Sequence, residues 1–288
     1  MTIQRLQPPE QLGDVVIRVG LPLFGGRLFY GVGPDVPKLV SANALYCRRR
    51  QGFLDADLLS KSHRRIALDS AGFVATKLYG GKFPWTLGEY VQLGALHAWD
   101  WWAQMDLCCE PEVAADREAV RARVAGTATL LSDCLAAARF LRDVEGASWA
   151  SEPMPVLQGW EAADYRWSAE LADATLDGRW PDLVGVGSVC RRNMKGTAGI
   201  PAVIRALDDC LPPNVRLHLF GVKSAGLREL SAHPRVASVD SCAWDFAARV
   251  EARKAQMSNT VEHRLSHLHT WLERQRGRKR EPVQMGLL

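Results

Sequence analysis

The feature that most constrains this chain is a repeated alternation of short apolar runs, rich in β-branched residues, with longer segments of helical periodicity. Such alternation favours a parallel sheet covered by helices. Eight expected strands, most of them followed by a helix, favour an α/β fold of the (β/α)8 TIM-like barrel type over an open doubly wound sheet. The expected strands are 14–20, 38–46, 65–73, 102–109, 154–159, 183–189, 215–222 and 235–241.

The segments between the runs carry helix signals. The helix expected over 86–99 opens with Thr86 and has Glu89 three residues later, which is the spacing of a capping box. The tail over 259–275 has the pattern of a further amphipathic helix. We therefore expect most strands to be followed by a helix, as a barrel of this type requires.

The chain of 288 residues, 47% of them hydrophobic, is long enough to bury a sizeable core. No internal repeat or linker-like composition divides it, so we expect a single domain over residues 1–288. The barrel core would span about 14–257, after an irregular N-terminal segment. A basic C-terminal helix and tail would follow at about 258–288.

The apolar runs and the cysteines indicate the cellular compartment of the protein. No run of about 18 or more apolar residues occurs, and the first residues are polar, so neither a transmembrane helix nor a signal peptide is expected. Seven cysteines are scattered without a framework, which favours reduced thiols. We expect a cytoplasmic protein with no membrane partner.

Polar residues and glycines occur where the expected strands end. Asp69, Asp106 and Asp240 each follow an apolar run, and Gln158 with Gly159 follows another. Gly185 lies in a further run, 183–189. In a barrel, the carboxyl ends of all strands meet at one mouth. A single aspartate there is often only a helix N-cap, but three acids and an amide in the same topological place predict a pocket.

The residue types suggest a chemistry. Two aspartates at one mouth suit displacement at a sugar carbon, where one carboxylate attacks the anomeric carbon and the other handles the leaving group's proton. A further acid, an amide and bare glycine backbone suit a planar heterocycle with donors and acceptors on its edge. From the residues alone, an unrelated barrel enzyme such as a glycosidase fits as well.

Basic residues are concentrated in a chain of net charge +4, at 46–50, 61–65 and 273–280. Such runs attract polyanions, although each alone is typical of a solvated face. A nucleic-acid partner is therefore plausible. The residues expected to contact phosphates are Arg48, Arg49, Arg191, Arg192 and Lys223.

Six motifs occur in order over roughly residues 65–245: "LDSAGF" (68–73), "MDLCCEP" (105–111), "VLQGW" (156–160), "LVGVGSV" (183–189), "LHLFGV" (217–222) and "VDSCAW" (239–244). Together they resemble the motifs of the tRNA-guanine transglycosylase superfamily. The spellings "SANALY", "GVGSVCRR" and "VDSCAW" are most similar to its DpdA branch, whose members act on DNA and insert 7-deazaguanine bases such as preQ0.

The resemblance implies roles for the strand-end residues. Asp240 would be the nucleophile at C1′ of a target guanosine, and Asp69 the general acid and base. Asp106 and Gln158, with Gly159 and Gly185, would bind the edge of the base, and Phe73 would stack on it or pack in the core. DNA, free preQ0 and the product guanine would be the partners, with a homodimer or accessory DNA-modification proteins as further ones. A phage or mobile element is a compatible source, with action in the cytoplasm of a bacterial host.

Departures from the family pattern leave alternatives open. The tRNA enzymes carry a cysteine-rich zinc site after the nucleophile strand, but no cysteine follows Cys242, so neither a zinc subdomain nor any cofactor is expected. His263, His267 and His269 are expected to be surface residues of an amphipathic helix. A tRNA-guanine transglycosylase of the queuosine or archaeosine type and a catalytically silent barrel partner subunit remain alternative functions.

Overall fold

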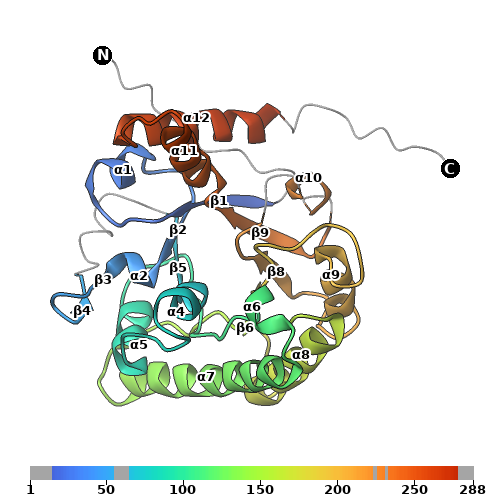
Figure 1. Ribbon diagram of the computed structural model, residues 1–288. Coiled ribbons are helices and arrows are strands. Elements are labelled where there is room, and N and C mark those ends of the chain that lie inside the picture. The colour runs from blue at the N-terminus through green and yellow to red at the C-terminus, as the bar shows by residue number, and fades with distance from the viewer. Residues whose placement is uncertain (1–14, 55–64, 223–225, 231–232, 278–288) are drawn as a thin grey trace.

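In the computed structural model, helices surround a curled parallel sheet (Figure 1). The structure describes residues 15–54, 65–222, 226–230 and 233–277. Helices α11 (Ala243–Lys254) and α12 (Val261–Gly277) lie at one side of the sheet, and α7 (Arg117–Asp143) lies at the opposite side. The fold is mixed α/β, and it is consistent with the expected TIM-like barrel.

The sheet has seven strands in the order β5-β2-β1-β9-β8-β7-β6, and every neighbouring pair is parallel. The first strand of the chain therefore pairs with the last. Parallel strands place all their carboxyl ends at the same edge. The strands are β1 (Val16–Leu21), β2 (Lys38–Ser41), β5 (Ile66–Asp69), β6 (Val156–Leu157), β7 (Leu183–Val186), β8 (Arg216–Leu219) and β9 (Val236–Ser241).

Residues 101–104 link the two edge strands of this sheet. The Ala103 N–H donates to the Leu68 carbonyl at 2.9 Å, on the β5 side. On the other side the Met154 N–H donates to the Trp102 carbonyl at 2.7 Å, just before β6. The same segment forms two isolated parallel bridges. The curl of the sheet is thus held by backbone hydrogen bonds at both of its edges.

The prediction of a strand over 102–109 is wrong beyond these bridges, because the side chain of Gln104 replaces the backbone in the next hydrogen bond to β6. The Gln104 Oε1 accepts the Val156 N–H at 3.0 Å, and its Nε2 donates to the Thr127 carbonyl at 2.7 Å. A backbone carbonyl would accept the Val156 N–H in a continuing strand. After Gln104 the chain is free to leave the sheet and to enter the cavity described below.

The run expected as one strand over 38–46 is divided. β2 ends at Ser41 and is followed by the short helix α2 (Ala42–Leu45). Next comes a small antiparallel hairpin of β3 (Tyr46–Cys47) and β4 (Gly52–Phe53). The aromatic rings of Tyr46 and Phe53 pack 5.6 Å apart across this hairpin. The residues of the run thus belong to three separate elements, β2, α2 and β3.

The expected helices are present. The capping box at the start of α5 is confirmed: the Glu89 N–H donates to Thr86 Oγ1 at 3.2 Å, and the Thr86 N–H donates to Glu89 Oε2 at 2.7 Å. The remaining helices are α1 (Gly26–Gly31), α4 (Gly72–Leu78), α5 (Leu87–Ala95), α6 (Pro111–Ala114), α8 (Ala162–Leu176), α9 (Ile200–Asp208) and α10 (Leu227–Leu230).

Helix α7 is long and apolar enough, by length and composition alone, to cross a membrane. Its buried residues nevertheless form a stripe at helical spacing, which includes Val120, Val124, Leu131 and Leu135. Such a stripe is typical of a helix that packs one face on a protein core. We therefore interpret α7 as a core helix.

The close packing of α5 on the sheet predicts a sharp contrast between two glycines of the same helix. A Cβ at Gly94 would overlap the indole of Trp102, which is fully buried, whereas a Cβ at Gly88 meets nothing within 4 Å. We expect Gly94→Ala to lower the free energy of unfolding by about 2 kcal/mol. Gly88→Ala should leave it unchanged or raise it by up to about 1 kcal/mol, and urea unfolding of both variants measures the difference. Equal stability of the two variants would contradict this packing.

Candidate active site

A cavity of about 160 Å³ lies at the edge of the sheet where the strands end. Asp69 is the last residue of β5, Asp240 lies near the end of β9, and Gln158 follows β6 directly. The parallel order of the strands brings these residues to one place, as expected from the sequence. The cavity is lined by Leu39, Asp69, Gly72, Phe73, Asp106, Cys108, Glu110, Gln158, Gly187, Ser188, Cys190, Phe220, Gly221 and Asp240.

Asp240 is held by groups from the neighbouring strand. It is 6% exposed, and its Oδ1 accepts the Gly221 N–H at 2.7 Å. The His218 Nε2 lies 3.5 Å from the same oxygen, while its Nδ1 lies 2.7 Å from Ser238 Oγ. Burial lowers the pKa of His218, so the imidazole is neutral and presents no full charge to the carboxylate. These contacts orient Asp240 within the cavity.

Asp69 sits in an environment that favours its protonated form. Burial raises the pKa of Asp69 to about 8, and the neighbouring carboxyls of Asp106 and Asp240 contribute in the same direction. Its Oδ2 accepts the Ala71 N–H at 3.2 Å, an interaction that opposes the shift only in part. At neutral pH this carboxyl therefore carries a proton and is equipped to donate it.

A chain of hydrogen bonds fixes Asp106 and Gln158. Asp106 accepts bonds from the Ser70 hydroxyl and from the Gln158 Nε2. The Ser188 hydroxyl donates to Gln158 Oε1 at 2.6 Å, and its oxygen accepts the Cys109 N–H at 2.6 Å. Because the Cys109 N–H can only donate, the Ser188 oxygen is the acceptor in that bond, and the Ser188 hydrogen is left for Gln158 Oε1. Burial raises the pKa of Asp106, and both of its hydrogen bonds oppose that shift.

The glycines divide into those that line the cavity and those that do not. A Cβ at Gly187 would collide with the Gln158 amide, so this position needs glycine for the amide to remain in place. Gly185 lies within β7, where a Cβ would be 2.7 Å from Phe220. Gly159 packs against Asp164 in the same way. Gly72, Gly187 and Gly221 thus line the cavity, whereas the two glycines expected from the sequence, Gly185 and Gly159, serve packing around it.

The rim of the cavity combines an aromatic ring with an ion cluster. Phe73, in the first turn of α4, is 40% exposed, and the Arg191 guanidinium lies 5.3 Å from its ring centroid. Arg191 also donates to Glu110 at 3.0 Å and to Glu112 at 2.8 Å. Phe73 is therefore an accessible flat surface at the entrance rather than a core residue.

The residues expected to bind phosphates differ in their exposure. Arg48 and Arg49 are exposed, and Arg48 stacks 4.9 Å above the ring of Tyr79. The prediction that Arg192 contacts phosphates is wrong, because this residue is only 6% exposed. Its guanidinium donates to the backbone carbonyls of Ser188, Gly159, Trp160 and Ala198. A guanidinium bound in this way stabilises a loop and is not accessible to a phosphate. Lys223 lies outside the described residues.

Two residues of the cavity were not expected from the sequence. Glu110 is buried and accepts bonds from the Cys190 thiol at 3.1 Å and from Arg191. Ser188 completes the chain of bonds to Gln158. Both stand inside motifs that the sequence analysis singled out, Glu110 in 105–111 and Ser188 in 183–189, but neither has a strand-end position that marks it.

The cysteines of the cavity have the properties of packed thiols. Burial raises the pKa of Cys108 to about 11, and it raises the pKa of Cys190 further above its ordinary value. A thiol needs a lowered pKa to act as a nucleophile at neutral pH. These thiols are therefore not activated as nucleophiles.

Replacement of Asp69 by asparagine tests its protonation. Between about pH 4 and pH 8 the folded chain holds a proton on Asp69 that the unfolded chain has lost, so stability falls as pH rises through this range. Relative to Asp69→Asn, the free energy of unfolding of the wild-type chain should fall by up to about 1 kcal/mol per pH unit. Urea unfolding from pH 5 to pH 8 measures this slope. Asp182→Asn, at an exposed position before β7, is the control and should show no such slope. If the difference in the free energy of unfolding between the wild-type chain and Asp69→Asn did not change with pH, Asp69 would not be protonated in the folded chain.

A comparison with protein families identifies the family of this chain. A family model described as DpdA, DeoxyPurine in DNA protein A, matches residues 33–283, whereas a comparison with curated proteins finds no match. The matched span covers most of the chain and contains Asp69, Asp106 and Asp240, and it supports a DNA-guanine transglycosylase type of function in broad terms. The chain therefore belongs to the DpdA family, DeoxyPurine in DNA protein A, a branch of the transglycosylase superfamily.

Proposed function

We propose that this protein is a DNA-guanine transglycosylase, a pentosyltransferase that exchanges guanine in DNA for a free 7-deazaguanine base such as preQ0. One observation carries the proposal: a carboxyl with its pKa raised to about 8, Asp69, lines the same cavity as the hydrogen-bonded carboxylate Asp240. A proton donor and a nucleophile are the two groups that displacement of a base from a sugar requires.

In the first half of the reaction, a carboxylate oxygen of Asp240 forms a bond to C1′ of the target deoxyguanosine. The bond from C1′ to the base breaks, and its electron pair goes to the guanine, which takes the proton of Asp69. The products are free guanine, an ester between Asp240 and the deoxyribose, and ionised Asp69. The negative charge on Asp69 now lies beside Asp106, and this repulsion favours recovery of a proton.

In the second half, Asp69 recovers that proton from the ring N–H of the incoming 7-deazaguanine. The nitrogen forms a bond to C1′, and the ester bond to Asp240 breaks to regenerate its carboxylate. One glycosidic bond is exchanged for another, so the step needs neither a nucleotide nor a redox cofactor to balance. The protein's part is to position two carboxyls and one flat base.

Recognition of the base is assigned to the polar wall of the cavity. Asp106 and Gln158 are held in fixed orientations by Ser70 and Ser188, so they offer a rigid pattern of acceptors and donors to the edge of a purine. Phe73, which lines the cavity, would stack on the base at the entrance. In duplex DNA the target must leave the stack, because its C1′ and its edge are not accessible together. Arg48 and Arg49 are exposed and available for the flanking phosphates.

The finer architecture belongs to the same proposal. We propose that residues 101–104 act as the fourth strand of a closed (β/α)8 barrel, between β5 and β6, and that residues 1–288 form one domain.

The proposed further partners are a second copy of the chain or accessory DNA-modification proteins, and the proposed compartment is the cytoplasm of a bacterial host. The described active-site residues need no metal for the steps above.

The nucleophile is tested with Asp240→Asn and DNA that carries radiolabelled guanine. With preQ0 present, the wild-type chain should release the label, and Asp240→Asn should release it at least about 1000-fold more slowly, because an amide does not form the ester. Asp182→Asn, at an exposed position before β7, is the control and should retain the wild-type rate. Wild-type activity in Asp240→Asn would remove this residue as the nucleophile.

The same assay distinguishes the alternative functions. Release of label from tRNA and not from DNA would overturn the choice of substrate. Failure of the purified wild-type chain to form a covalent adduct with DNA in the absence of free base would favour a silent partner subunit. Formation of an adduct by the chain alone would exclude that alternative.

The pH dependence of guanine release tests the proton donor. Because Asp69 donates its proton in the first step and has a pKa of about 8, the rate should be constant near pH 7 and fall about tenfold per pH unit above pH 8. Single-turnover release of labelled guanine measures this profile directly. A rate that stays constant to pH 9.5 would contradict the role of Asp69.

A further inference from the structure

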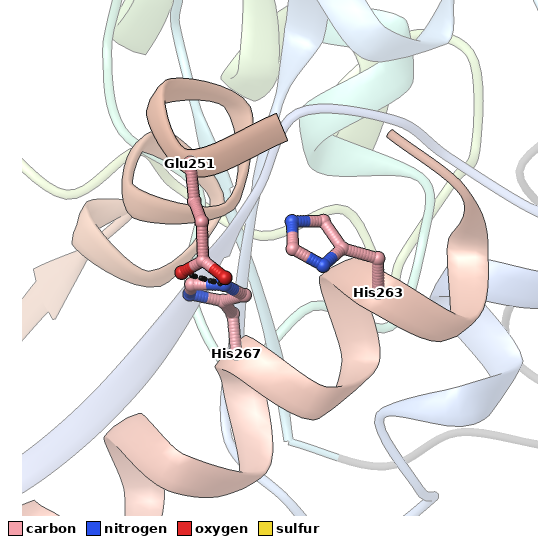
Figure 2. Close-up of side chains that lie close together, drawn as sticks. All are labelled: Glu251, His263 and His267. Carbon is pink, nitrogen blue, oxygen red and sulfur yellow. Dashed lines mark ion pairs between the residues drawn. The ribbon is translucent and has the colours of Figure 1, made fainter. Parts of the chain in front are cut away.

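Two histidines of α12 and one glutamate of α11 meet on the outer face of the protein (Figure 2). The ligand atoms of Glu251, His263 and His267 all lie within 4.8 Å of one another. The two histidines are four residues apart, so they share one face of α12, and their rings lie 4.7 Å apart. Glu251 reaches them from the facing helix, and its Oε2 lies 3.1 Å from the His267 Nε2.

The hydrogen bond of His263 prepares this ring to bind a metal. Its Nε2 lies 3.0 Å from the Ala248 carbonyl of α11, and because a carbonyl only accepts, Nε2 must carry the hydrogen. In the neutral ring the other nitrogen, Nδ1, then holds a free lone pair. Metal-binding histidines are commonly oriented by such a bond from the second nitrogen to a backbone carbonyl.

The separations suit a small divalent cation. Zn²⁺ binds imidazole nitrogen and carboxylate oxygen at about 2.0–2.2 Å, so tetrahedral ligand atoms lie about 3.3 Å apart. The Glu251–His267 pair is at this separation, and the remaining pairs need to close by about 1.5 Å at most. The Glu251 side chain is 61% exposed and is free to make this adjustment by rotation.

We propose that Glu251, His263 and His267 form a zinc site that joins α11 to α12, with water as the fourth ligand. The site is separate from the cavity of Asp69 and Asp240. Glu251 lies eight residues after Ala243, about 12 Å along α11 from the start of the helix that follows β9. None of the three residues lines that cavity.

The position of the site suggests a structural role. It lies beside a groove of about 830 Å³ between α11 and α12, lined in part by Glu251 and His267. The ion pair of Asp245 with Arg264 of α12 holds the two helices together nearer the start of α11. A metal bound farther along would hold the other end of α11. Zinc would thus clamp the pair of helices that begins directly after the proposed nucleophile strand.

Metal content and thermal stability test the site in the full chain. After treatment with EDTA, dialysis against ZnCl2 and removal of loosely bound ions, the wild-type chain should retain about one zinc per chain. Its Tm should be roughly 5 °C higher with ZnCl2 than with EDTA, because the metal binds the folded state. The double variant His263→Ala/His267→Ala and the milder Glu251→Gln should lose both the zinc and the shift.

His269→Ala is the matched control, because this histidine belongs to the same helix but not to the cluster, and it should keep the zinc and the shift. Retention of zinc by the double variant would place the metal elsewhere, for example on the thiols, and would overturn the proposal. The absence of zinc and of a Tm shift in the wild-type chain would overturn it as well. Circular dichroism of each variant without metal confirms that a loss reflects binding and not unfolding.

Discussion

The parallel pairing of β1 with both β2 and β9 is the contact on which the rest of the structure depends. It joins the first strand to the last and places Arg18 of β1 opposite Asp240 of β9. Arg18 is buried, pairs with Asp100 at 2.8 Å and donates to the carbonyls of Lys38 and Arg65. A buried guanidinium needs such partners, and burial lowers its pKa even so. The strands that carry Asp69 and Asp240 are thereby held in one curved surface.

The electrostatics of the cavity follow from this arrangement. Three carboxyls from distant parts of the chain converge where little water reaches them, so they do not all ionise at neutral pH. Asp240 accepts the Gly221 N–H at 2.7 Å, whereas Asp69 accepts the Ala71 N–H at 3.2 Å and has its pKa raised by burial and by the carboxyls of Asp106 and Asp240. The proposed roles of nucleophile and acid thus follow from burial and charge coupling together with hydrogen bonding around similar side chains.

Much of the fold and part of the site could be predicted from local pattern. The runs at 183–189, 215–222 and 235–241 became strands because alternation with helices leaves few other solutions. Asp69, Asp106, Gln158 and Asp240 were found because strand ends converge in any parallel sheet that curls. Ser188 and Glu110 could not be found, since a serine or glutamate in a loop has no periodicity. Arg192 was misassigned because its sequence neighbourhood does not reveal the four carbonyls that surround it.

By itself the sequence determined the order of strands and helices and the acids at the strand ends, because these depend on residue type and spacing along the chain. Only the tertiary structure decided which nitrogen of His263 carries hydrogen, which glycines line the cavity and which aspartate is protonated. It also brought Glu251 to the histidines of α12 and buried Asp245, which reads as an ordinary surface acid in the sequence. The reason is physical: burial, hydrogen bonding and charge coupling act between groups close in space, whatever their separation in the chain.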